Sequence, residues 1–179
     1  MQTQTVSTYQ YINSDPKTYQ CRKIAAPIHD IDIELVNQDG RPFGSKELSG
    51  KPYVTAFFFT SCVTICPKIM GAMASLQTTF KQKDLDVHLV AITVDPDNDT
   101  PQRLRAAGQK AGADFKRWTF LTGSKSKVTN VIVHGFKTYV GNRQDLGDDL
   151  FDIGHGARFV LVDRNGGVLG NYEHTDFGL

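Results

Sequence analysis

The sequence predicts an α/β fold in which helices flank a central mixed sheet, and three observations lead to this prediction. Residues 53–60 and 87–94 are β-prone runs without Asp, Glu, Lys or Arg, as expected of strands covered on both faces. Each run precedes a segment with the signals of a helix. Residues 157–173 contain two further β-prone runs around a turn at 164–167, which predicts a terminal antiparallel hairpin.

The N-terminal part divides into a polar arm, residues 1–26, and the start of a domain that we place at residues 27–179. The arm lacks hydrophobic periodicity and contains Asp15-Pro16, a pair that disfavours regular structure. It holds neither the apolar core of a secretory signal nor a membrane span, so a membrane anchor is expected only outside this sequence. Residues 31–43 alternate apolar and polar side chains around Asp39-Gly40, which predicts an added N-terminal hairpin.

Three helices are expected between the strands. Apolar residues of the first recur at helical spacing, at Ile69, Met73, Leu76 and Phe80. Thr100 can cap a second helix over residues 101–110, and Ser124 can cap a third that ends near residue 136. Residues 141–152 are polar and glycine-rich, so a loop is expected there. A βαβ unit followed by a ββ unit around one sheet is the pattern of a thioredoxin-like fold.

Composition argues against several classes of function. The 179 residues are enough for one domain with a sizeable core. A formal net charge of +1 provides no long-range field that would attract nucleic acid or an anionic membrane surface. Three cysteines are too few for the disulfide framework of a small secreted domain. No nucleic-acid partner is expected, and any cysteine chemistry is expected to be local.

Cys62 and Cys66 carry the clearest chemical signal. They follow a predicted buried strand, and Pro67 indicates that a helix begins near Cys66. A helix N-terminus favours the thiolate, which is the form that binds metal or attacks a disulfide. Two thiolates select Cu(I) or zinc, but the same spacing also allows the two sulfurs to join each other. Paired cysteines at a strand-to-helix junction argue against a purely structural role.

Three segments of the chain resemble the Sco/SenC family. FFFTSCVTICPKIMGAMASLQ is similar to the family's CxxxCP copper segment, TVDPDNDTPQRL to its stretch after the next strand, and DIGHGARFVLVDRNGGVL to its histidine-bearing segment. The resemblance extends over roughly residues 27–177. It implies that Cys62, Cys66 and His155 bind one copper ion, as Cu(I) or Cu(II).

The resemblance implies a metallochaperone that delivers copper during assembly of cytochrome c oxidase. The expected partner is the copper-accepting subunit of that oxidase or another copper protein. It also implies an anchored domain in the periplasm or the mitochondrial intermembrane space, and we expect a monomer. The alternative is a thiol-disulfide oxidoreductase in which Cys62 and Cys66 are catalytic and His155 is dispensable. A peroxiredoxin-like peroxidase is the least favoured function.

Other candidate residues carry weaker signals. Asp95 follows the second predicted strand, where it could orient His155 or serve as a turn residue. Met70 and Met73 are expected to pack under the sheet rather than to bind metal. Cys21 lies outside the resemblance and is expected to have no function. Solvated or core roles are expected for the remaining histidines, His29, His88, His134 and His174.

Overall fold

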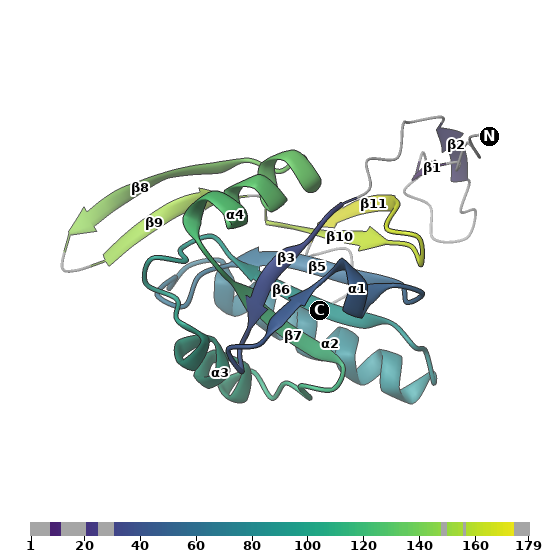
Figure 1. Cartoon of the computed structure of the whole chain (residues 1–179), viewed down its shortest axis with the longest axis horizontal. Helices are drawn as coiled ribbons and strands as arrows, with labels where there is room; N and C mark the ends of the chain where they lie inside the picture. The colour runs from purple at the N-terminus through teal and green to yellow at the C-terminus, as the bar shows by residue number, and fades with distance from the viewer. Residues whose placement is uncertain (1–7, 12–20, 25–30, 148–149, 156, 174–179) are drawn as a thin grey trace.

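The computed structural model describes residues 8–11, 21–24, 31–147, 150–155 and 157–173 (Figure 1). A seven-stranded mixed sheet in the order β11-β10-β5-β6-β7-β3-β4 forms its centre. The strands are β3 (Glu34–Asn37), β4 (Pro42–Gly44), β5 (Tyr53–Phe58), β6 (His88–Thr93), β7 (Trp118–Thr122), β10 (Arg158–Val162) and β11 (Val168–Glu173). β5, β6 and β7 run parallel to one another, and their neighbours β10 and β3 run antiparallel to them.

Helices cover both faces of this sheet. α2 (Cys66–Gln82) and α3 (Pro101–Lys110) connect the parallel strands in the same direction, so right-handed crossovers place both on one face. α4 (Lys125–Thr129) continues into the π-helical turn η1 (Asn130–Gly135) and lies on the other face (Figure 1). A four-residue helix, α1 (Ser45–Leu48), follows β4. The architecture is thioredoxin-like, as predicted.

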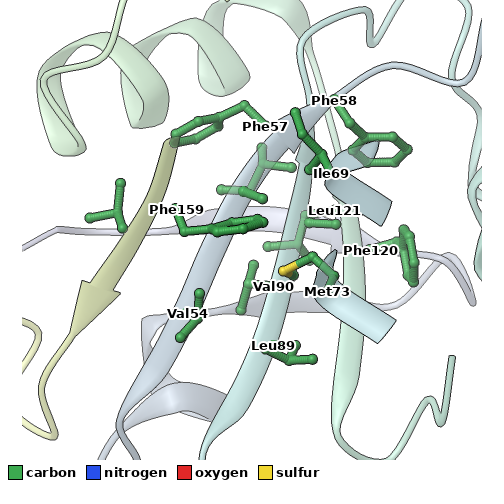
Figure 2. Packing of buried hydrophobic residues seen from close by; sticks show 14 of the residues in the cluster. Val54, Phe57, Phe58, Ile69, Met73, Leu89, Val90, Phe120, Leu121 and Phe159 are labelled. Carbon is green, nitrogen blue, oxygen red and sulfur yellow. The ribbon is translucent and has the colours of Figure 1, made fainter. Parts of the chain in front are cut away.

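The core lies on both sides of β5. Successive side chains of a strand point to opposite faces, and the aromatic contacts of β5 follow this rule. The Phe57 ring packs edge-on against Phe136, with 5.4 Å between centroids, and the Phe58 ring packs edge-on against Phe120 at 5.7 Å. Figure 2 shows Phe57, Phe58 and Phe120 among the buried side chains of this core. Every residue of β5 is buried, which confirms the strand predicted to be covered on both faces.

The predicted helix starts are confirmed. The Thr100 hydroxyl accepts a hydrogen bond from the backbone N–H of Arg103 at 3.3 Å, and Ser124 accepts one from Lys127 at 3.4 Å. Pro67 and Pro101 each lie in the first turn of their helix. A backbone N–H at this position has no acceptor within the helix, so a proline, which lacks the N–H, costs no hydrogen bond. The predicted opening hairpin is present as β3 and β4.

Two predictions about irregular segments were wrong. Residues 141–152, expected to be a loop, lie mostly in an antiparallel hairpin of β8 (Val140–Gly147) and β9 (Leu150–His155), which extends from the body of the fold (Figure 1). The N-terminal arm contains a strand pair, β1 (Thr8–Tyr11) and β2 (Cys21–Ile24). In both hairpins, backbone hydrogen bonds between two segments hold the strands together. Such pairing does not require the alternation of apolar and polar residues on which the prediction relied.

Candidate metal centre

Cys62 and Cys66 lie where β5 meets α2. The chain leaves β5 at Phe58, and the backbone N–H of Cys62 donates a hydrogen bond to the Phe59 carbonyl at 3.2 Å, which forms a turn. Cys66 is the first residue of α2, as predicted from Pro67. Both cysteines are buried, with 7% of Cys62 and 3% of Cys66 exposed.

The cysteine loop directs a backbone donor at one sulfur. The N–H of Cys66 donates a hydrogen bond to Cys62 Sγ at 3.3 Å, and Thr64 Oγ1 lies 3.6 Å from the same sulfur. The first N–H groups of a helix have no partner inside the helix and carry partial positive charge. Donation to sulfur therefore favours the thiolate at Cys62, the form needed both for metal binding and for disulfide chemistry.

Asp99 anchors the start of this loop. Its carboxylate accepts hydrogen bonds from the Thr60 backbone N–H at 3.0 Å, from Thr60 Oγ1 at 2.5 Å and from Thr93 Oγ1 at 2.5 Å. Asp99 is completely buried, and desolvation raises its pKa although the hydrogen bonds from Thr60 and Thr93 oppose the rise. This carboxylate joins the cysteine loop to the end of β6. No sequence signal distinguishes Asp99 from an exposed turn residue, because an aspartate shortly before a helix is a common turn residue.

The structure places His155 only through its backbone. It is the last residue of β9 and pairs with Val140 of β8, while its side chain lies outside the described residues. Within the parts of the chain that the structure describes, no three His, Cys, Asp or Glu side chains form a group that could hold a metal ion. The structure therefore brings Cys62 and Cys66 together, and the metal-binding role of all three residues stays a prediction.

Comparison with known proteins identifies the family. The SCO1/SenC family model matches residues 23–177. The chain belongs to the SCO1/SenC family. A SCO1/SenC family lipoprotein from Bacillus anthracis is 39% identical, with a TM-score of 0.72 over 83% of this chain and 88% of that chain. BsSco, a member of the Sco family of cytochrome c oxidase assembly proteins in which a disulfide switch was identified, is 31% identical, with a TM-score of 0.71 over 84% and 86%. Copper-bound ScoI from Bradyrhizobium japonicum shares the fold, with 23% identity and a TM-score of 0.71 over 80% and 88%.

The structure also shows where Asp95 and two of the other histidines of this SCO1/SenC chain lie. Asp95, buried at the end of β6, accepts hydrogen bonds from Asn98 Nδ2 at 3.0 and 2.9 Å, which supports the turn role. His88 lies in β6 with Nε2 2.9 Å from Thr119 Oγ1, and burial lowers its pKa to about 4. His134 is exposed on η1. His29, His174 and the side chain of Cys21 lie outside the described residues.

Both cysteines line a pocket of about 390 Å³. Its walls come from the end of β5, from α2 and from α3, and they include Met70, Ala107 and Lys110. The pocket is open and lies beside the two cysteines, on the side of the fold that carries α2 and α3. A copper ion or a partner's side chain can therefore approach the buried thiols from this side.

Proposed function

We propose that this chain is a metallochaperone that binds one copper ion and delivers it during the assembly of cytochrome c oxidase. The ligands are the thiolates of Cys62 and Cys66 and the imidazole of His155. The observation that carries the proposal is the pair of buried thiols in a pocket, with the Cys66 N–H directed at Cys62 Sγ.

The donor set fits copper. Thiolates are soft ligands that select Cu(I), and imidazole is compatible with both oxidation states of copper. The family membership and the role of BsSco in cytochrome c oxidase assembly support this assignment. Copper-bound ScoI shows that a protein with this fold holds copper. Copper is cargo in this proposal, and its release proceeds by exchange of the Cys62 and Cys66 thiolates for ligands of the accepting protein.

The partner and the location follow from the same assignment. The acceptor is a copper-binding subunit of the oxidase or another copper protein. The chain works as an anchored domain in the periplasm or the mitochondrial intermembrane space, in line with the lipoprotein from Bacillus anthracis. Among the described residues, no helix combines the length and apolar character needed to cross a bilayer. Residues 27–179 form the copper-binding domain, and residues 1–26 form the arm that precedes it.

A second function is favoured by the disulfide switch in BsSco. In a thiol-disulfide oxidoreductase, the Cys62 thiolate attacks a partner's disulfide and forms a mixed disulfide. The Cys66 thiolate then displaces the partner's second sulfur. The partner's disulfide gains two electrons and two protons and becomes two thiols, while Cys62 and Cys66 become a disulfide. This reaction uses the same two sulfurs and does not use His155.

Anaerobic titration with Cu(I), followed by oxidation to Cu(II), separates the two functions. We expect one copper per chain and a sulfur-to-copper charge-transfer band, loss of binding in Cys62→Ser and Cys66→Ser, and strong weakening in His155→Ala. His134→Ala is the matched control because His134 is exposed on η1. Absence of copper binding in the wild type, together with rapid reduction of a model disulfide, would replace the chaperone function with the oxidoreductase function.

A further inference from the structure

Met70 packs against the hydrophobic core, as expected, and it also lines the cysteine pocket. Its side chain is partly buried and lines the same 390 Å³ pocket as Cys62 and Cys66. Three sulfur-bearing residues therefore face one cavity. The facing wall contains small side chains such as Ala107 and Ala111, so the pocket stays open beside these sulfurs.

Helix geometry brings the thioether toward the thiols. Met70 is four residues after Cys66 on α2, so both lie on the same face of the helix, one turn apart. Side chains on a helix tilt toward its N-terminus and cover the preceding turn. The Met70 side chain is therefore directed back over the first turn of α2, where Cys66 lies.

We propose that Met70 is a third sulfur ligand for Cu(I) in this pocket, beside Cys62 and Cys66. The inference rests on the proposed copper function and extends it. A neutral thioether is a soft ligand that stabilises Cu(I), whereas imidazole also serves Cu(II). Met70 therefore adds to the two thiolates and His155 in the Cu(I) form, and it contributes little to the Cu(II) form.

The position of Met70 also suits the transfer of Cu(I) to an accepting protein. Cys62 and Cys66 are buried, whereas Met70 is partly exposed at the same pocket. A thioether binds more weakly than a thiolate and is the first ligand that an incoming sulfur or nitrogen can displace. Met70 thus occupies the place where an accepting protein's ligand enters. When that ligand is a thiol, its proton passes to solvent as the thiolate binds, and the copper stays Cu(I) throughout.

Met73 provides a matched control on the same helix. It lies one turn further along α2, is completely buried, and belongs to the packed core (Figure 2). It does not line the cysteine pocket. Replacing either methionine by Leu nearly conserves volume, so both variants are expected to fold.

Selenium-edge X-ray absorption of the Cu(I)-loaded, selenomethionine-labelled chain tests the proposal. The chain has three methionines, Met1, Met70 and Met73. We expect a copper neighbour at selenium in the wild type and in Met73→Leu, and no such neighbour in Met70→Leu. A wild type that binds Cu(I) without this signal, or a Met70→Leu variant that keeps it, would overturn the inference alone. A wild type that binds no copper would overturn the proposed function, and the inference with it.

Affinities measured against a competing chelator give an independent readout. Met70→Leu is expected to weaken Cu(I) binding by roughly tenfold and to leave Cu(II) binding unchanged. Met73→Leu is expected to change neither affinity. His155→Ala is expected to weaken Cu(II) binding more than Cu(I) binding. Equal Cu(I) affinities in Met70→Leu and Met73→Leu would overturn the inference.

Discussion

The backbone N–H of Cys66 donates a hydrogen bond to Cys62 Sγ across 3.3 Å. The donor belongs to the first residue of α2, so the two cysteines are not equivalent. The Cys62 sulfur receives a charge-stabilising donor from the helix terminus, while Cys66 contributes that donor. Cys62 is also the more exposed of the two, at 7% against 3%.

This asymmetry predicts the order of alkylation. With the reduced protein and limiting iodoacetamide, Cys62 is expected to react before Cys66, because its sulfur accepts the Cys66 N–H hydrogen bond and its side chain is the more exposed. Peptide mass mapping at successive times measures the order. Bound Cu(I) should protect both cysteines. Faster labelling of Cys66 in the metal-free chain would contradict the assigned asymmetry.

Asp99 is expected to contribute strongly to stability. Asp99→Ala removes the acceptor for the Thr60 N–H and for two threonine hydroxyls in a buried setting, which should lower the free energy of unfolding by about 3 kcal/mol. Urea unfolding measures the change. Asp97→Ala is the control, because Asp97 is 62% exposed and its ion pair with Lys125 is expected to contribute little. Equal stabilities of the two variants would show that the carboxylate does not anchor the loop.

His88 is expected to make the protein sensitive to mild acid. Burial holds its folded-state pKa at about 4, below its ordinary value of 6.5. As pH falls between these values, the unfolded chain takes up the proton first, so the wild type loses up to about 3 kcal/mol of stability over this window. His88→Gln should lack this loss, and His134→Gln should retain it. Urea unfolding of the wild type and both variants at pH 7, 5.5 and 4.5 measures the loss. The same dependence of stability on pH in all three proteins would contradict the prediction.

Two helix glycines are expected to respond oppositely to alanine. A Cβ added at Gly71 on α2 meets no atom within 4 Å, so Gly71→Ala should stabilise the fold by about 1 kcal/mol through helix propensity. At Gly108 on α3 the same atom would lie 2.6 Å from the Phe115 ring and 2.9 Å from the Phe120 ring. Gly108→Ala should therefore destabilise by about 1 to 3 kcal/mol. Thermal unfolding of both variants measures the sign, and the same sign in both would refute the assigned packing.

Much of the fold could be predicted because its signals are local. The apolar run at residues 53–60 indicated a central strand, and the caps at Thr100 and Ser124 marked helix starts that the structure confirms. The hairpin of β8 and β9 could not be predicted in this way. Its residues are polar, and its strands are held by pairing between segments rather than by a buried apolar face.

In the candidate site, too, some features could be predicted from sequence and others only from the tertiary structure. Sequence alone identified Cys62 and Cys66 and placed them at the start of a helix, because the CxxxCP pattern is contiguous and a proline in the first turn is a local signal. Only the tertiary structure decided that Asp99 is buried against Thr60 and that Met70 faces the cysteine pocket while Met73 enters the core. Spacing along a helix determines which face a residue shares, whereas burial depends on which strands and helices pack against that face.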